Sequence, residues 1–195
     1  MTYGILLAAG TSSRMGRPKQ LLEWRERPLV RHVAEQALAS QRLTGLVVVV
    51  GAAADAVRAT LVGLAGPVLI VENPSYASGQ ASSLRAGLGA LPAAARAALV
   101  LLVDQPLVTT ALIDEMIAAY DADRDTLAII PYYRGRRGNP ALLARAIFDE
   151  LRLLEGDVGA REVLARHAGA VRHLVVDDPA VVSDIDTPED YAGMQ

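Results

Sequence analysis

Residues 5–19 read ILLAAGTSSRMGRPK, an apolar run that passes directly into a loop of small and basic residues. A continuous apolar run of this length is typical of a β-strand that helices cover on both faces. Similar runs recur along the chain, and stretches with helical periodicity separate them. The predicted strands are residues 5–9, 46–50, 68–71, 99–103, 127–131 and 171–176, and the predicted helices are residues 28–40, 55–64, 82–91, 110–120, 144–151 and 159–167. Strands that alternate with helices predict an α/β fold in three layers, with a mostly parallel sheet in the middle.

The composition predicts one globular domain over residues 1–195, since 52% of the residues are hydrophobic and 21% are charged. Nineteen basic and 22 acidic residues give a net charge of −3, which argues against binding to nucleic acid or to an anionic membrane. Cysteine is absent, so disulfides, thiolate metal sites and cysteine nucleophiles are excluded. The N-terminal residues lack the pattern of an export signal, and no window approaches about 18 uninterrupted apolar residues, so we expect a cytoplasmic protein.

The loop that follows the first predicted strand has the chemistry of a phosphate site. Its small residues leave backbone N–H groups uncovered, and such groups can form a concave cradle for an anion. Arg14, Arg17 and Lys19 add positive charge, and no acidic residue precedes Glu23. The loop has neither the G-x-G-x-x-G pattern of dinucleotide sites nor the spacing of a P-loop, and an ordinary solvated loop is the alternative interpretation.

Two acidic segments are candidates for a metal site. Asp104 directly follows the predicted strand 99–103, where a carboxylate can hold Mg²⁺ over bound phosphates, although an aspartate before a proline is also typical of turns. Asp184 and Asp186 alternate along an extended segment, so they point the same way and repel unless a cation or a proton lies between them. The residues that follow, Thr187 to Asp190, predict a helix start.

Three further segments combine glycine with polar or basic residues. Residues 73–87 provide a polar entry to a helix, in which Ser82 also fits an N-cap. Residues 134–140, RGRRGNP, form a basic turn, and residues 156–161, GDVGAR, open the helix that follows. Each segment also has a purely structural interpretation, as a hairpin turn or a helix start with solvated arginines.

The ordered motifs LAAG at 7–10, SRMG at 13–16 and PK at 18–19 resemble the signature loop of the MobA-like nucleotidyltransferases. The resemblance implies a Rossmann-like fold of the nucleotide-diphospho-sugar transferase type. It also implies catalytic roles for Lys19, Arg14 and Asp104, and a Mg²⁺ site, or alternatively a Mn²⁺ site, at Asp104 and Asp186. The implied nucleotide-binding residues are Leu7, Ala8, Ala9, Gly10, Arg14, Lys19, Gly79 and Ser83, and the implied acceptor-binding residues are Arg134, Asn139, Pro140, Asp157 and Arg161.

The Ala-Ala-Gly form of the loop resembles the cytidylyltransferase branch of this family, whereas the guanylyltransferase branch typically has Ala-Gly-Gly. That branch transfers CMP from CTP to the terminal phosphate of molybdopterin in a Mg²⁺-dependent reaction and releases pyrophosphate. The resemblance therefore implies CTP and molybdopterin, or the molybdenum cofactor, as substrates, and a recipient molybdoenzyme or its chaperone as a partner.

Three alternatives stay open at this point. The chain could use another nucleoside triphosphate or another phosphorylated acceptor. It could be a flavin- or nicotinamide-dependent oxidoreductase on the same fold, against which the missing G-x-G-x-x-G motif argues. It could also be a noncatalytic cofactor-binding protein, which would have no need for the paired acids Asp104 and Asp186.

Overall fold

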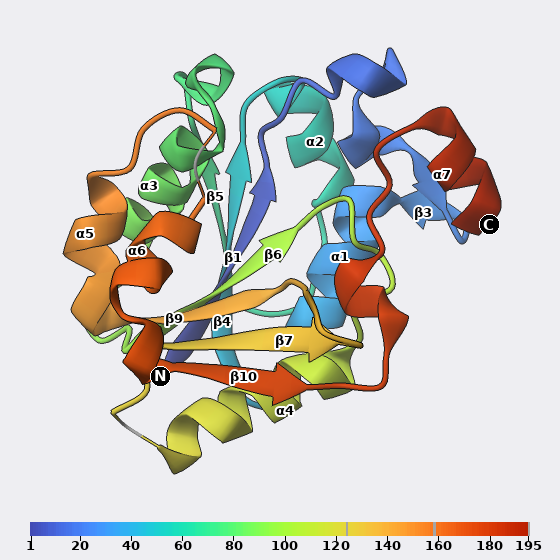
Figure 1. Ribbon diagram of the computed structural model, residues 1–195. Coiled ribbons are helices and arrows are strands. Elements are labelled where there is room, and N and C mark those ends of the chain that lie inside the picture. The colour runs from blue at the N-terminus through green and yellow to red at the C-terminus, as the bar shows by residue number, and fades with distance from the viewer. Residues whose placement is uncertain (124, 158, 195) are drawn as a thin grey trace.

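A twisted β-sheet forms the middle layer of the molecule, which Figure 1 shows as a computed structural model that describes residues 1–123, 125–157 and 159–194. The order of strands along the sheet is β10-β7-β9-β6-β1-β4-β5, and β8 pairs with β7 beside this path. The strands are β1 Thr2–Ala8, β4 Leu43–Val50, β5 Val68–Glu72, β6 Ala97–Leu102, β7 Ala128–Tyr133, β8 Arg136–Arg137, β9 Ala141–Ala144 and β10 Val171–Val175. A separate small hairpin joins β2 Glu23–Trp24 to β3 Arg27–Pro28.

Helices cover both faces of this sheet. The α-helices are α1 Leu29–Leu38, α2 Ala54–Thr60, α3 Gln80–Ala90, α4 Thr110–Ala122, α5 Phe148–Arg152, α6 Arg161–Arg166 and α7 Pro188–Met194. The 3₁₀ turns are η1 Ser13–Met15, η2 Lys19–Leu21, η3 Tyr76–Ser78, η4 Arg145–Ile147, η5 Ala168–Ala170 and η6 Pro179–Val182. Among the described residues, no helix is both long and apolar enough to cross a membrane.

Alternation along the central strands explains why two separate cores form. In β1, Leu6 and Ala8 pack into the core beneath α1, α2 and α4, whereas Ile5 and Leu7 pack into the core beneath α3, α5 and α6. Successive side chains of a strand point to opposite faces, so a strand with apolar residues at every position supplies both layers. The predicted three-layer α/β fold is confirmed (Figure 1).

The direction of the strands places most of their carboxyl ends at one edge of the sheet. β1 runs parallel to both β4 and β6, and β5 and β10 run parallel to their neighbours β4 and β7. Strand order reverses at β1, because β4 and β5 continue the sheet on one side and β6 begins the other. In open α/β sheets this reversal is where ligands bind.

One predicted helix is partly wrong. Residues 144–151 were expected to be helical, but Ala144 ends strand β9, a 3₁₀ turn follows, and α5 begins only at Phe148. β9 is antiparallel to both β6 and β7, and it fills the space between them. Its four residues are all buried and apolar, a pattern that fits a buried strand and a buried helical turn equally well.

Candidate active site

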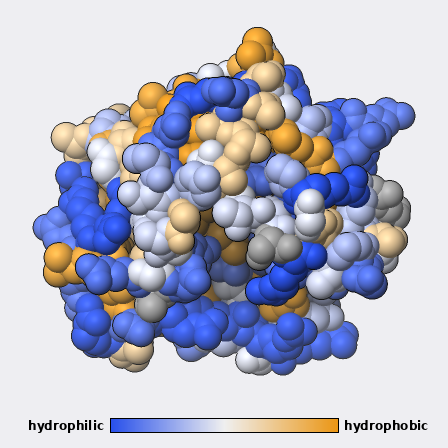
Figure 2. Space-filling view, turned by 90° about the horizontal axis from the view of Figure 1, so that it is seen from above, coloured by the Kyte–Doolittle hydropathy of each residue, from blue (hydrophilic) through white to orange (hydrophobic). Residues whose placement is uncertain are grey.

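Two adjoining cavities open at the carboxyl edge of the sheet. The first has a volume of about 490 Å³ and lies between the loops that follow β1, β5 and β6; we call it the nucleotide cavity, after the role that the sequence predicts for its lining residues. The second, of about 470 Å³, lies toward β9 and α6 and is called the acceptor cavity on the same basis. They share the wall residues Leu7, Gln80, Leu102 and Asp157. Figure 2 looks onto this edge and shows a hollow near its middle, with apolar surface at its floor and mostly hydrophilic surface around it.

The basic loop after β1 is fixed from below by a buried glutamine. The side-chain amide of Gln20 donates hydrogen bonds to the backbone oxygens of Ala8 at 2.9 Å and Gly10 at 2.7 Å. The backbone N–H of Lys19 donates to Ser12 Oγ at 2.9 Å, which closes the loop. No hydrogen bond joins the N–H groups of Gly10 or Thr11 to another described residue. The loop is therefore held open with free donors, as an anion cradle requires.

Four charged side chains from three separate segments of the chain meet above this loop. Lys19 Nζ lies 2.6 Å from Asp186 Oδ1 and 3.5 Å from Asp104 Oδ2. Arg14 Nη1 lies 2.9 Å from Asp186 Oδ2 on the more exposed side. Only 11% of the Lys19 side chain is exposed, so the ammonium group is held in the cleft and not in bulk solvent. The structure thus brings together the four charged residues that the sequence predicted.

Backbone contacts hold the two acidic segments against each other. The N–H of Ile185 donates to the backbone oxygen of Asp104 at 2.9 Å. The predicted helix start is also confirmed: α7 begins at Pro188, and Asp190 Oδ2 accepts hydrogen bonds from the N–H of Thr187 at 2.8 Å and of Asp186 at 3.1 Å. The hydrogen bond from the N–H of Asp186 to Asp190 fixes the backbone of Asp186 at the start of α7. The side chain of Asp186 extends from this fixed position to Lys19.

The electrostatics of the acids differ from one residue to the next. Burial, together with the nearby charges of Asp184 and Asp186, raises the pKa of Asp104 despite the neighbouring Lys19 ammonium. Burial and then the charge of Asp186 raise the pKa of Asp184. In contrast, the hydrogen bond from Lys19 lowers the pKa of Asp186. The ionised form of Asp104 is therefore short of positive partners in the protein alone.

The residues present fit a divalent cation. Asp104 Oδ1 is buried and has no hydrogen-bond partner among the described residues, so it is a hard oxygen donor without an assigned role. The described residues hold no group of three or more metal-ligating side chains that could bind an ion by themselves. Mg²⁺ commonly takes one or two carboxylates and completes its shell with substrate phosphates and water, which matches this arrangement.

The opposite wall of the nucleotide cavity is the start of α3. The buried side chain of Asn73 donates to Ser82 Oγ at 2.8 Å and Ser83 Oγ at 3.1 Å, and Ser83 lines the cavity. Gly79, directly before the helix, has φ of 107° and lies against the backbone of Gly156. A Cβ atom at Gly79 would lie 2.3 Å from the carbonyl carbon of Gly156, so only glycine fits this contact.

Replacing Gly79 with alanine is expected to lower the free energy of unfolding by about 1–3 kcal/mol, the usual cost of such a backbone conformation in a residue other than glycine. The clash with Gly156 adds to this strain and should also displace a wall of the nucleotide cavity. Thermal unfolding measures the loss of stability. Gly89→Ala in the same helix is the matched control, since no atom lies within 4 Å of its Cβ position. Equal stabilities of the two variants would contradict the assigned role of Gly79.

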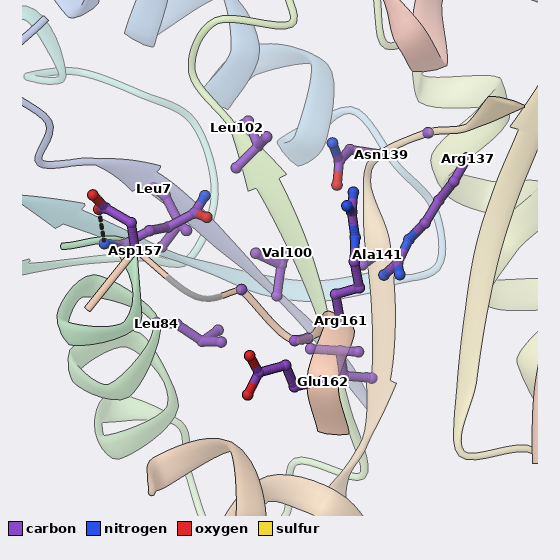
Figure 3. A pocket seen from close by; sticks show the side chains of 15 residues that line it. Leu7, Leu84, Val100, Leu102, Arg137, Asn139, Ala141, Asp157, Arg161 and Glu162 are labelled. Atoms are coloured by element: carbon purple, nitrogen blue, oxygen red, sulfur yellow. Dashed lines mark hydrogen bonds between the residues drawn. The ribbon is translucent and has the colours of Figure 1, made fainter. Parts of the chain in front are cut away.

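The acceptor cavity has an apolar floor and a basic end (Figure 3). Leu84, Val100 and Leu102 contribute to the floor, and Arg137 and Arg161 supply the positive charge. Asp157 stands on the wall shared with the nucleotide cavity, where its Oδ1 accepts a hydrogen bond from the N–H of Gln80 at 3.2 Å.

The predicted acceptor residues are only partly brought together. Asn139, Asp157 and Arg161 line the acceptor cavity. Arg134 lies at the exposed tip of the β7–β8 turn, over the ring of Tyr133, and lines neither cavity. Pro140 is buried next to Asn139 and also stays outside both linings.

Three residues that the sequence interpretation did not assign contribute to the site: Gln20, Asn73 and Arg137. Asn73 lies inside the recognised segment 73–87, and Gln20 directly follows the recognised loop 5–19. Both are buried polar side chains, and burial is not visible in one sequence. Arg137 was part of the basic turn, but the sequence did not show which arginine of the turn faces inward. The register of the β7–β8 pair determines the direction of each arginine: Arg137 lies opposite Tyr132 and Arg136 opposite Tyr133, so the two side chains point to opposite faces of the sheet.

Comparison with known proteins agrees with this geometry at the level of the family. A family profile described as the MobA-like NTP transferase domain matches residues 4–171. Nicotine blue oxidoreductase of Paenarthrobacter nicotinovorans is 34% identical over 194 residues, which cover 95% of this chain and 92% of that protein. Molybdenum cofactor cytidylyltransferase of Escherichia coli strain K12 is 26% identical over 187 residues, which cover 96% of this chain and 92% of that protein.

Solved structures agree with the fold. The protein Rv0371c of Mycobacterium tuberculosis H37Rv, crystallised as a complex with manganese, has 30% sequence identity and a TM-score of 0.74, with 99% of this chain and 97% of that chain covered. CMP:2-keto-3-deoxy-manno-octonic acid synthetase complexed with CTP has 15% identity and a TM-score of 0.77, with 99% and 96% covered. The second likeness shows the fold alone, and it confirms the predicted nucleotide-diphospho-sugar transferase type.

Proposed function

We propose that this chain, which belongs to the MobA-like NTP transferase family, transfers CMP from CTP to the terminal phosphate of molybdopterin and releases pyrophosphate. One observation supports this most strongly: Lys19 and Asp104 line the nucleotide cavity, Lys19 also pairs with Asp186, and a second cavity with its own positive charge lies directly beside it. Transfer between two phosphorylated substrates needs two adjoining sites and cations at the junction.

The basic loop is assigned to the triphosphate. The free N–H groups of Gly10 and Thr11 would donate to phosphate oxygens, and Arg14 and Lys19 would neutralise their charge. Without nucleotide, Lys19 and Arg14 are paired with Asp186. The base and ribose would lie between the backbone of Ala8 to Gly10 and the start of α3, where Ser83 and Gly79 stand.

The acceptor phosphate would attack the α-phosphorus from the side of the acceptor cavity, in line with the departing pyrophosphate. Both reactants are anions, so the main obstacle is their mutual repulsion, and positioning with electrostatic stabilisation is the principal source of catalysis. Lys19 and Arg14 would stabilise the charge that builds up on the leaving group. A phosphate monoester is already ionised at neutral pH, so no side chain has to act as a general base.

Asp104 and Asp186 would hold the divalent cation, which supplies further charge neutralisation over the phosphates when it is bound. The unpartnered Oδ1 atom of Asp104 supports this assignment. The similarity to Rv0371c, which was crystallised with manganese, supports a divalent ion in general. Lys19, which pairs with both carboxylates, would contact the phosphates once these carboxylates hold the cation.

The proposal predicts a preference among nucleotides. With molybdopterin and Mg²⁺ present, pyrophosphate release should be faster with CTP than with GTP, because Ala9 stands where the guanylyltransferase branch typically has glycine. The assay is run with each nucleotide, with and without molybdopterin, and after removal of the cation by a chelator. Equal rates with CTP and GTP would contradict the base assignment, and no molybdopterin-dependent release with any nucleotide would contradict the proposed function.

A second candidate is an oxidoreductase, because nicotine blue oxidoreductase is 34% identical over nearly the whole chain. The apolar floor of the acceptor cavity would suit a flat organic substrate, and the neighbouring cavity would take a nicotinamide or flavin cofactor. Such a reaction would not explain the paired carboxylates of Asp104 and Asp186. Consumption of a reduced nicotinamide cofactor in the presence of an organic dye, together with no pyrophosphate release from CTP, would favour this candidate.

A further inference from the structure

Two arginine side chains meet in the acceptor cavity without an acidic partner. Arg137 comes from β8 and Arg161 from the start of α6, and Figure 3 shows their side chains next to each other. Burial, and then the positive charge of Arg161, lower the pKa of Arg137. Among the described residues, neither arginine side chain forms an ion pair or a hydrogen bond. Their positive charge is therefore not neutralised by the protein around them.

The acidic residues nearby do not change this balance. Asp157 and Glu162 also line the acceptor cavity, but Asp157 accepts a hydrogen bond from Gln80, and Glu162 makes no ion pair with either arginine. A smaller cavity of about 260 Å³ borders the same two arginines on another side, and it is lined by apolar residues with Tyr132 and His173. These two rings stack on each other at 4.2 Å between centroids, and no acid is among that lining.

Arg137 is also held in place by its backbone. It pairs with Tyr132 across the β7–β8 hairpin, and the next residue, Gly138, is so tightly packed that a Cβ atom would lie 2.4 Å from the backbone oxygen of Val181. Its neighbour Arg136 is exposed on the other side of the strand. A half-buried guanidinium on a fixed strand, beside a second one, is costly unless an anion binds there.

The position of the pair shows which substrate this anion would belong to. Arg137 and Arg161 line the acceptor cavity and not the nucleotide cavity, where Arg14 and Lys19 of the basic loop already supply positive charge. Figure 3 shows the apolar floor with Leu84 and Val100 between the arginine pair and the shared wall with Asp157. A molecule that spans this cavity would have its reacting phosphate at the shared wall, an apolar middle, and a second polar end at the arginines.

We propose that the acceptor carries a second anionic group, apart from the phosphate that reacts, and that Arg137 and Arg161 bind this group. The inference rests on the proposed function, since it names the chemical class of the acceptor in that reaction. Guanidinium groups favour anions that offer two acceptor atoms side by side, because they bind both atoms at once. The pair would thus select acceptors and would orient them toward the α-phosphorus.

The test compares two simple probes that differ in one anionic group, phenyl phosphate and 4-carboxyphenyl phosphate. Calorimetric titration without nucleotide should show that the wild-type protein binds the carboxylated probe about tenfold more tightly, as expected for one charge-assisted contact. Arg137→Met and Arg161→Met should each remove this advantage and leave the affinity for phenyl phosphate nearly unchanged. Arg136→Met, which removes a charge from the exposed side of the same strand, is the matched control and should retain the advantage.

Three results would overturn the inference. The first is equal affinity of the wild-type protein for both probes, and the second is an equal loss for both probes in the variants, which would assign the arginines to the reacting phosphate. The third is the same loss in Arg136→Met, which would indicate a general effect of charge. Thermal unfolding checks that each variant is folded, and Arg161→Met, at a more exposed position, is the second variant should Arg137→Met not fold. Failure of the proposed function is seen separately, as absent pyrophosphate release, and the binding result does not depend on it.

Discussion

Replacing Lys19 with alanine is expected to lower CTP-dependent pyrophosphate release by about a thousandfold, with little change in the fold. A unit charge pair at 4 Å is worth about 4 kcal/mol at an effective dielectric constant near 20, and this corresponds to roughly three decades in rate if it acts only in the transition state. The Lys19 side chain is mostly enclosed and contacts both acids, so no other described cation occupies its place. The measurement is the rate of pyrophosphate release at saturating CTP, with circular dichroism as a check on folding.

Arg17→Ala provides the matched control for Lys19. Arg17 lies in the same loop, but it is exposed, stacks over the ring of Tyr191 and does not line the nucleotide cavity. Its loss removes one positive charge from the loop without touching the cleft, so the rate should fall only a few-fold. A Lys19→Ala variant that releases pyrophosphate at a nearly normal rate, or an Arg17→Ala variant as impaired as Lys19→Ala, would refute the role assigned to Lys19.

Replacing Asp104 with asparagine is expected to remove most of the activity without lowering the stability of the protein. Because the pKa of Asp104 is raised in the folded state, its ionised form is disfavoured there, and this cost is fully present at pH values above the folded pKa. Asparagine has no charge, so at neutral pH it relieves this cost while it forfeits a carboxylate ligand for the cation. We expect pyrophosphate release to fall by about three orders of magnitude, and the melting temperature without ligands to stay the same or rise.

Measuring pyrophosphate release by asparagine variants of Asp184 and Asp186 distinguishes the roles of these two acids. Asp186→Asn should be as impaired as Asp104→Asn, since Asp186 contacts both Arg14 and Lys19. Asp184→Asn should lose far less, because Asp184 is only partly shielded from solvent and forms no ion pair with Lys19 or Arg14. A pronounced fall in stability of Asp104→Asn, or an equal loss of activity in Asp184→Asn, would contradict this division.

The sequence alone determined the layers of the fold. The predicted strands exist within a few residues of their expected bounds, because apolar runs without alternation can be buried only between two layers of helices. The sequence alone also predicts the helix start at Thr187, because a cap depends on residues that are close along the chain. The basic loop and the acids after the strands were also identified, because they stand at the carboxyl ends of strands in a parallel sheet.

The tertiary structure alone decided which of these residues meet. The pairing of β8 with β7 turned Arg137 toward the acceptor cavity, while Arg134 stayed at the exposed tip of the turn. The insertion of β9 between β6 and β7 replaced part of a predicted helix, and Gly156 approaches Gly79 from a loop far along the chain. These outcomes depend on contacts between distant segments, whereas the periodicity of a single sequence reports only on neighbours. Local patterns therefore revealed the elements and the kind of chemistry at their ends, and packing set the side of each strand and the partner of each charge.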